Sequence, residues 1–439
     1  MNTSDFLKII FDFLNNHVEY AVLRNFEGLP YHNNSRDIDI AIEQEAFFNI
    51  KHTLISLIND CNWKIITNLK SDRLITWVCG IVREDKTVDV IQFDFFYHTS
   101  LFGIILLDNK DILATRVFNG EIYHPNKAYE FLDKYMYDRA VGVQYPDKYK
   151  TTRDAVEQDV EMLGVVKKVF GAKSLIECDK MSKSQILKSA LKYNLKHYGL
   201  SCVLRYLKFE YYHIRNYICS NTGFSIGFTG PDGSGKTTVI DLLIDNLGDV
   251  FRKAHMYYHF RPLIFGNLSD VAHSAGLKKE VDRNYDQPHR GGKTNVISSL
   301  FRLIYYSIDY IIGYFLKVKT ITRITRLVIF DRYFTDIICD SRRSRIYLGP
   351  KFLYLWKKCL IPSLDYNILL TAHTDTILSR KKELDEAGIK AINDRIDFLA
   401  KKKGYIKILN ETTPQDAVCE ILTQIFEEQN RKNLKRLNK

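Results

Sequence analysis

The residues best suited to phosphate chemistry lie in one glycine-rich segment, Gly230-Pro231-Asp232-Gly233-Ser234-Gly235-Lys236-Thr237-Thr238. It fits the pattern G-x-x-x-x-G-K-[ST], in which backbone N–H groups surround phosphate oxygens at a helix N-terminus. In such a loop Lys236 would reach the β- and γ-phosphates of a nucleotide, and the Thr237 hydroxyl would hold Mg²⁺. The apolar run 224–228 before it predicts a buried strand, and 236–247 predicts a helix that ends at Gly248. This strand–loop–helix context favours a site for ATP and Mg²⁺ over a glycine turn without a ligand.

A second carboxylate is expected beside this loop. The apolar segment 326–331 predicts a strand that ends at Asp331, and Arg332 and Tyr333 follow directly. A carboxylate in this place is the expected Mg²⁺-side partner of a phosphate-binding loop. Further on, 362–370 predicts another buried strand, and charged helices are expected at 378–384 and 389–400. Strands that alternate with helices predict a parallel sheet whose ligand lies at the carboxyl ends of the strands.

Three aspartates in the first part of the chain could hold divalent cations. Asp37 and Asp39 lie two residues apart in a predicted strand, so their side chains share one face, and Asp94 comes from another strand. Two aspartates at this spacing and a third from a nearby strand can hold two ions that orient a nucleotide triphosphate. The alternative is that the pair simply ends a strand at a solvated edge.

The second half of the chain, from Phe224 to about Leu422, resembles the thymidylate kinase family of nucleoside monophosphate kinases. The resemblance rests on G-P-D-G-S-G-K-T-T, F-D-R-Y, and the later P-S-L-D and R-K-K-E segments. It implies ATP-dependent transfer of a phosphoryl group to a phosphate or a hydroxyl of a small acceptor. It also implies that Asp232 contacts a sugar hydroxyl of the acceptor, that Asp331 and Arg332 serve the metal and the acceptor phosphate, and that Arg261 contacts this phosphate.

Two groups of basic residues extend this predicted site. Gly233 stands where some family members carry a catalytic arginine, so the transition-state cation is expected from a lid segment with Arg380, Lys381 and Lys382 as candidates. Arg342 and Arg343 follow Phe334-Thr335-Asp336-Ile337-Ile338-Cys339-Asp340-Ser341, where the family usually carries residues that pack against thymine. That departure leaves thymine recognition open. The arginine pair either holds a phosphate or lies at the surface beside acidic residues.

The carboxylates of the first part resemble the nucleotidyltransferase superfamily. More narrowly, Leu23-Arg24-Asn25-Phe26-Glu27-Gly28-Leu29-Pro30 before Asp37-Ile38-Asp39 is similar to bacterial proteins that fuse such a lobe to a thymidylate-kinase-like lobe. Those proteins are often linked to surface-polysaccharide pathways. The superfamily normally carries Gly-Ser or Gly-Gly for the triphosphate before its paired aspartates, and this chain has residues 24–28 in that region.

The length of 439 residues predicts more than one domain. We expect an α/β protein with a nucleotidyltransferase-like domain at 1–175, a basic helical connector at 176–222, a P-loop domain with a three-layer parallel sheet at 223–428, and a basic tail at 429–439. Eight cysteines are scattered singly without a C-x-x-C pair, which indicates neither a zinc site nor a disulfide framework. Residues 1–5 lack the basic region of a signal peptide, so a reducing cytoplasm is the expected compartment.

The net charge of +11 calls for anionic partners. Much of the excess lies between 179 and 215, where lysines and arginines alternate with tyrosines. This connector is either a solvated helix or a surface for peripheral contact with an anionic membrane, and nucleic acid is the less favoured partner. The apolar stretch 300–318 is interrupted by Arg302 and Asp309, which favours a buried helix over a membrane span. A homodimer is left open.

Two hypotheses follow. In the first, the chain is an ATP- and Mg²⁺-dependent kinase that acts on a nucleotide or phosphosugar-like acceptor and carries a nucleotidyltransferase-like lobe. In the second, it is an ATP-binding scaffold or regulator of surface-polysaccharide synthesis without kinase turnover. Release of ADP that depends on an acceptor would distinguish them.

Overall fold

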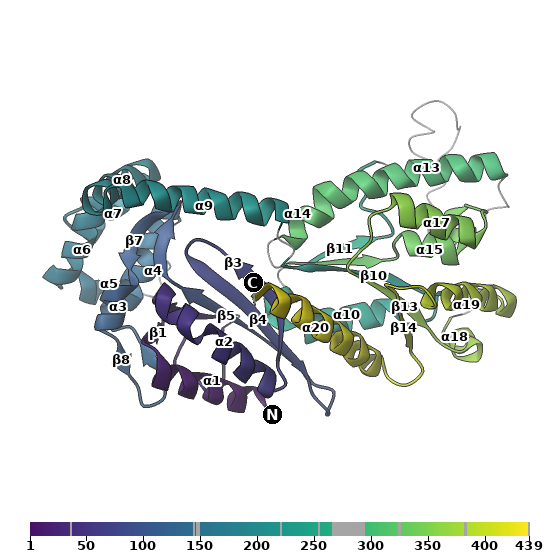
Figure 1. The fold of residues 1–439 in the computed structure, drawn as a ribbon, viewed down its shortest axis with the longest axis horizontal. Helices are drawn as coiled ribbons and strands as arrows, with labels where there is room; N and C mark the ends of the chain where they lie inside the picture. Colours follow the sequence, from purple (N-terminus) through teal and green to yellow (C-terminus); the bar gives the residue numbers. More distant parts are fainter. Residues whose placement is uncertain are drawn as a thin grey trace. The chain divides into compact units, whose positions relative to one another are not determined.

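The fold is given by a computed structural model that describes residues 1–35, 37–143, 145, 150–219, 222–252, 255–265, 295–323, 326–381 and 384–437 (Figure 1). It divides into two compact units. Unit 1 comprises residues 1–81, 89–219 and 429–439, and unit 2 comprises 82–88 and 220–428. Each unit is built around its own five-stranded sheet. The predicted α/β fold class is confirmed.

Unit 1 begins with helices and strands that carry alternating or amphipathic apolar patterns. Its elements are α1 (Thr3–His17), β1 (Tyr20–Val22), β2 (Asp37–Ile42), α2 (Gln44–Asp60), β3 (Lys64–Lys70), β4 (Leu74–Val82), β5 (Val88–Phe96), β6 (His98–Leu101), β7 (Ile104–Asp108), α3 (Asn109–Ala114), β8 (Val117–Phe118), β9 (Tyr123–His124), α4 (Lys127–Val141), α5 (Lys150–Glu157), α6 (Val160–Phe170), α7 (Leu175–Lys180), α8 (Lys183–Tyr198) and α9 (Leu200–Cys219).

The sheet of unit 1 is mixed and has the order β1-β2-β5-β4-β3. Strands β2 and β5 run parallel, and their register pairs Asp39 with Asp94. Helices α1 and α2 bury apolar side chains such as Phe6 and Phe47 against the aromatic residues Trp63 and Phe95 of the sheet region. A second core lies around α4, α6 and α8 and includes Tyr135. The aspartates are therefore held by strands that are packed on an aromatic core.

Unit 2 alternates strands and helices in the predicted manner. Its elements are β10 (Phe224–Thr229), α10 (Lys236–Asn246), α11 (Gly248–Arg252), β11 (His255–His259), α13 (Val296–Gly313), the π-helix η2 (Tyr314–Val318), α14 (Lys319–Thr322), β12 (Leu327–Asp331), α15 (Phe334–Cys339), α16 (Ser341–Ser344), α17 (Pro350–Leu360), β13 (Tyr366–Thr371), α18 (Thr374–Arg380), α19 (Glu386–Ala400), β14 (Ile406–Leu409) and α20 (Pro414–Leu437).

The sheet of unit 2 has the order β11-β12-β10-β13-β14, and its neighbouring strands run parallel. Helices α13, α15, α17 and α19 share one core with sheet residues such as Val328 and Phe330. Figure 1 shows α15 on one side of these strands and α10 on the other. Because the strands are parallel, the segments that follow β10, β12 and β13 gather at one edge of the sheet.

Three predicted element boundaries differ in unit 2. The strand expected at 362–370 begins at Tyr366, because Asp365 instead accepts hydrogen bonds from the Ser225 backbone N–H at 2.8 Å and hydroxyl at 2.7 Å. The helix expected at 378–384 begins earlier, at Thr374, and ends at Arg380. Lys382 lies outside the described residues. The expected helix 300–318 begins at Val296 and continues as a π-helix after Gly313.

The two units divide the chain differently from the predicted domains. Residues 176–219 of the predicted connector pack within unit 1, and the predicted tail is the last part of α20. Within unit 1, Asn433 of this helix donates to the carbonyl oxygens of Ile65 at 2.9 Å and Ile66 at 2.8 Å. Within unit 2, Gln415 donates to the Lys86 carbonyl at 2.8 Å. These side-chain contacts to backbone groups explain why distant chain segments complete each unit.

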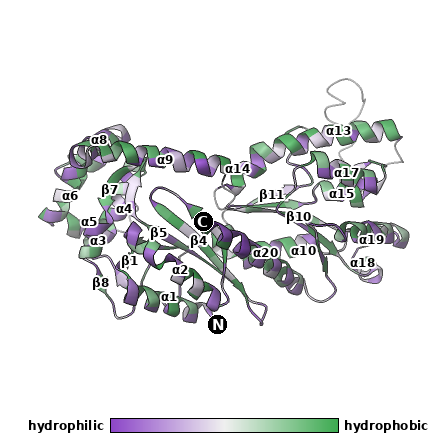
Figure 2. Ribbon diagram, in the orientation of Figure 1, coloured by the Kyte–Doolittle hydropathy of each residue, from purple (hydrophilic) through white to green (hydrophobic). Residues whose placement is uncertain are grey.

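One helical stretch, Val296–Thr322, is long and apolar enough to cross a membrane by length and composition, as core helices of water-soluble proteins also can be. About a third of the residues in its most apolar part are buried. Its inward face carries Asp309, which is fully buried. Figure 2 shows apolar residues along α13 alternating with polar ones.

Candidate active site

The phosphate-binding loop has the backbone that its glycines predict. Gly235 adopts φ +87° and caps the N-terminus of α10, a conformation that L side chains rarely adopt. A Cβ on Gly230 would lie 2.0 Å from the Leu370 carbonyl oxygen, so only glycine fits between β10 and β13. Gly233 faces α18, where an added Cβ would lie 3.1 Å from the Ile377 carbonyl oxygen. The loop is therefore packed closely against the next strand and helix.

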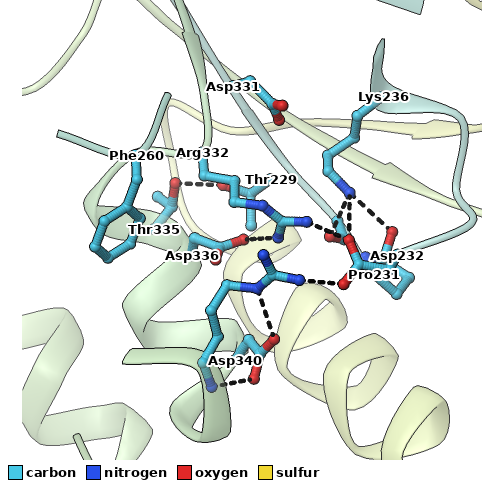
Figure 3. A network of polar contacts seen from close by, with 12 residues as sticks. Thr229, Pro231, Asp232, Lys236, Phe260, Asp331, Arg332, Thr335, Asp336 and Asp340 are labelled. Atoms are coloured by element: carbon cyan, nitrogen blue, oxygen red, sulfur yellow. Dashed lines mark hydrogen bonds and ion pairs between the residues drawn. The ribbon is translucent and has the colours of Figure 1, made fainter. Parts of the chain in front are cut away.

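Lys236 lies inside this loop. Its Nζ donates to the carbonyl oxygens of Gly230 and Pro231, each at 2.9 Å, and lies 3.9 Å from the Asp232 carboxylate (Figure 3). Burial, and then the charge of Arg332, lower the pKa of Lys236 from 10.5 to about 8. The ammonium is thus held by weak carbonyl partners, and a polyphosphate would be a much stronger one.

Asp331 ends β12 directly beside the loop, since the parallel register pairs it with Phe228 of β10. Its Oδ2 accepts from the Tyr257 hydroxyl at 3.1 Å and lies 3.3 Å from Nδ1 of His259, both on β11. Its buried Oδ1 has no hydrogen-bond partner within the described part of the chain. Burial raises the pKa of Asp331, but the His259 hydrogen bond and the charges of Lys236 and Arg332 outweigh this effect and lower it to about 2.

The residues present fit a Mg²⁺ ion. An ionised carboxylate with an unsatisfied, buried oxygen is a hard oxygen ligand of the kind that Mg²⁺ prefers. Thr237 and Thr238, at the start of α10, are exposed to solvent, so the Thr237 hydroxyl is available to the same edge of the sheet. Asp331 and Thr237 are the residues that would hold the ion.

Two arginines converge on the carboxylate of the loop. Arg332 contacts Asp232 with one guanidinium nitrogen and Asp336 with the other, the latter at 3.0 Å. Arg343 also contacts Asp232, and its Nε lies 3.6 Å from Asp340. Arg332 has a left-handed backbone, φ +74°, which is strained for a residue other than glycine and is typical of functional sites. Positive charge is thereby gathered beside the phosphate loop.

Of the arginine pair, one residue lies at the phosphate loop and the other at the surface beside an acidic residue. Arg343 joins the site through Asp232. Arg342 is exposed, and its NH1 lies 3.7 Å from the exposed Asp385. Asp336 and Asp340 were not among the predicted site residues, although the i,i+4 spacing of Arg332 and Asp336 in an apolar segment was a usable signal.

Two other predicted site residues have partners away from the loop, and a third, Arg380, bonds to a residue that itself contacts the loop. Arg261 is buried, pairs with Asp309 at 3.2 Å and lies 4.5 Å from the centre of the Tyr306 ring. Tyr333 is buried in the core and donates to the Pro362 carbonyl at 2.8 Å. Arg380 is exposed and donates to the Asn410 carbonyl at 3.1 Å. An added Cβ on Gly233 would lie 3.3 Å from Cβ of Lys381, so the end of α18 lies over the loop.

The three aspartates of unit 1 do come together. One oxygen of each of Asp37, Asp39 and Asp94 lies within 4.8 Å of the others, the spacing of a candidate metal site. Burial, and then the Asp39 charge, raise the pKa of Asp94 to about 7. Arg24 forms ion pairs with Asp39 and, at 3.2 Å, with Asp133. The sequence analysis did not assign Arg24, which here supplies positive charge to the carboxylates.

Comparison with known proteins adds similarity in fold only. A scan against family models and a search of curated proteins find no match. Among solved structures, the chain is similar to thymidylate kinase from Candida albicans at 17% identity and a TM-score of 0.34, covering 47% of this chain and 93% of that one. It is also similar to thymidylate kinase from Ehrlichia chaffeensis at 17% identity and a TM-score of 0.31, covering 46% of this chain and 98% of that one. The function proposed below therefore rests on the residues of the site.

Proposed function

We propose that unit 2 is an ATP- and Mg²⁺-dependent kinase of the nucleoside monophosphate kinase type. It transfers the γ-phosphoryl group of ATP to a nucleotide or phosphosugar-like acceptor. The main support for this proposal is that Lys236, Arg332 and Arg343 all lie at one glycine-rich loop of the phosphate-binding type. Asp331 lies beside the same loop. Three cations around a loop that binds phosphates suit a reaction in which two phosphorylated molecules must be held together.

The residues of the site have distinct roles in this reaction. Lys236 exchanges its carbonyl partners for the β- and γ-phosphates, and Asp331 with Thr237 would hold Mg²⁺, which neutralises phosphate charge when bound. Arg332 and Arg343 are already charged and oriented by Asp232, so an acceptor phosphate can take over their free N–H groups. The acceptor oxygen forms a bond to the γ-phosphorus while the bond to the bridging oxygen breaks, and ADP leaves.

The experiment is a screen of the full chain for acceptor-dependent release of ADP. ATP is supplied with Mg²⁺ and a panel of nucleoside monophosphates and sugar phosphates. Lys236→Met should abolish the release, whereas Lys390→Met, which changes an exposed lysine on α19, should not. If the wild-type chain binds ATP but releases no ADP with any acceptor, the ATP-binding scaffold is favoured instead.

The lid cation can be tested in the same assay. Arg380 and Lys381 end α18 above Gly233. An arginine that stabilises the transferring phosphoryl group acts mainly in the transition state. Arg380→Ala should therefore lower the single-turnover rate by about 10³-fold with little change in acceptor affinity. An unchanged rate in Arg380→Ala together with a loss in Lys381→Ala would transfer the role to Lys381.

We further propose that unit 1 holds a divalent cation at Asp37, Asp39 and Asp94, as a nucleotidyltransferase-type site would. The support is the close approach of their oxygens and the raised pKa of Asp94, since a cation would relieve the repulsion among these carboxylates. Calorimetric titration of the Lys236→Met chain with Mn²⁺ tests it, and Asp37→Asn should weaken the binding. Equal binding by both proteins would leave unit 1 without this metal site.

A further inference from the structure

Helix α9 is amphipathic in the opposite sense to most surface helices. A surface helix normally buries its apolar side and exposes its polar side. In α9 the polar residues contact unit 1: Arg205 donates to the Gly103 carbonyl at 3.4 Å, Lys208 to Gln44 at 3.3 Å, and Asn216 to the Lys70 carbonyl at 2.9 Å. The side that faces solvent carries mainly apolar residues, together with the exposed His213 and Arg215.

The exposed side of α9 is a continuous apolar stripe. It consists of residues spaced three or four apart over more than four turns: Leu204, Leu207, Tyr211, Ile214 and Ile218, with Val203 beside them. Leu204 is 66% exposed and Ile218 is 62% exposed, so about half or more of each of these side chains faces solvent. Contiguous exposed apolar surface of this extent marks an interaction site in a folded protein.

Basic side chains accompany this stripe. Residues 183–218 contain seven lysines and arginines and one carboxylate, Glu210. On α8, Lys188, Lys192 and Lys196 are exposed at a spacing of four residues, opposite the buried Ala190 and Asn194 and beside the exposed Leu191 and Leu195. A second copy of this face would bring like charges together, whereas an anionic lipid surface is complementary to both the charge and the apolar side chains.

We propose that α8 and α9 form a membrane-docking surface, on which the apolar stripe of α9 inserts among the acyl chains of an anionic bilayer and the lysines of α8 contact lipid headgroups. The inference is independent of the proposed kinase activity, because none of these residues lies in the phosphate site. It places unit 1 on a membrane surface through these two helices.

The test is co-sedimentation of the full chain with vesicles. Binding is expected to vesicles of phosphatidylglycerol and phosphatidylcholine in equal parts, weak binding to phosphatidylcholine alone, and loss of binding as salt is raised. Leu204→Ser with Leu207→Ser should weaken binding by about a hundredfold, since two exposed leucines no longer insert. Lys188→Glu with Lys192→Glu should weaken it at least on the order of twentyfold.

A matched control replaces apolar residues that are equally exposed elsewhere. Phe352 and Leu355 on α17 are 45% and 58% exposed, and Phe352→Ser with Leu355→Ser should leave vesicle binding unchanged. Circular dichroism and thermal unfolding show whether each variant is folded. Equal binding by the α9 variant and the wild type overturns the proposal. So does a dimer, detected by light scattering, that the α9 variant abolishes while vesicles bind neither protein.

Discussion

The buried Lys236 ammonium is expected to couple the proposed binding of nucleotide to proton uptake. In the free site its partners are two carbonyl oxygens at 2.9 Å, and burial lowers its pKa to about 8. A polyphosphate beside the ammonium favours the charged form and therefore raises the pKa toward its ordinary value. Above pH 8 the free site is largely neutral at this position, so a bound nucleotide must be accompanied by a proton.

The size of the effect follows from the lowered pKa. At pH 9 a group with a pKa of about 8 is about nine-tenths neutral, so binding of Mg·ATP should take up about 0.9 proton. At pH 6.5 the Lys236 amine is already charged in the free protein, so it should take up close to no proton on binding. Calorimetric titrations in two buffers with different enthalpies of ionisation measure this number directly and require no turnover.

The pH dependence of folding stability tests the lowered pKa of Lys236 in a second way. The unfolded chain holds this proton up to about pH 10.5 and the folded chain only to about pH 8, so the free energy of unfolding rises with pH across that window. Below it, the charged lysine costs the fold about 3 kcal/mol, because one pKa unit is worth about 1.4 kcal/mol. Lys236→Met removes this cost together with two hydrogen bonds of about 1 kcal/mol each.

The free energy of unfolding of Lys236→Met should therefore lie within about 2 kcal/mol of the wild-type value at pH 7. Its free energy of unfolding should also lack the rise between pH 8 and 10.5. Its proton uptake at pH 9 should vanish, whereas Lys390→Met should retain it. Uptake of the same size in Lys236→Met and the wild type would refute the reasoning, because the proton would then belong to another group.

Three further perturbations test other parts of the chain. Arg343→Gln should lower kcat/KM for the acceptor about tenfold to a hundredfold, whereas Arg342→Gln at the exposed ion pair should change it little; equal effects in steady-state kinetics would contradict this division. Because the pKa of Asp94 is raised from 3.8 to about 7 in the fold, the stabilisation by its proton is complete below about pH 3.8 and is lost between there and about pH 7. In denaturant titrations Asp94→Asn should therefore match the wild type at about pH 3.5, exceed it by about 1.5 kcal/mol at pH 5 and by about 4 kcal/mol at pH 8. Arg261→Met should cost about 3–5 kcal/mol of unfolding free energy because it leaves Asp309 buried and unpaired; a loss of acceptor affinity without loss of stability would show a role as ligand instead.

Local patterns predicted the parts of the molecule that are determined by short stretches of chain. The loop around Lys236 lies between strand and helix as expected, because glycine spacing and apolar runs are local properties. Asp37, Asp39 and Asp94 were expected to meet, and they do, since alternation along β2 fixes the face of the first two and the parallel register with β5 supplies the third. Pattern and period are sufficient where one strand or one turn decides the geometry.

Partners across long chain separations could not be predicted in this way. Arg261 was assigned by resemblance to an acceptor phosphate, yet Asp309 lies 3.2 Å away in the fold because α13 packs beside the segment after β11. Similarly, nothing local distinguishes Arg342 from Arg343, and only the turn of α16 sends one toward Asp232 and the other toward Asp385. The sequence alone does not show which carboxylate an arginine will pair with, because tertiary packing determines which carboxylates lie within its reach.

The same reasoning applies to α9 on a larger scale. Its basic, tyrosine-rich sequence is compatible with a solvated helix, because composition does not say which side faces the protein. The fold determines which side of α9 faces the protein. Arg205, Lys208 and Asn216 contact the rest of unit 1, and the apolar side chains that would ordinarily be buried remain exposed. A helix that turns polar residues toward the protein exposes apolar surface to water at a cost in free energy, and that cost is recovered only when the surface is covered. Orientation of the helix, rather than its composition, is therefore the property from which a membrane-facing role can be inferred.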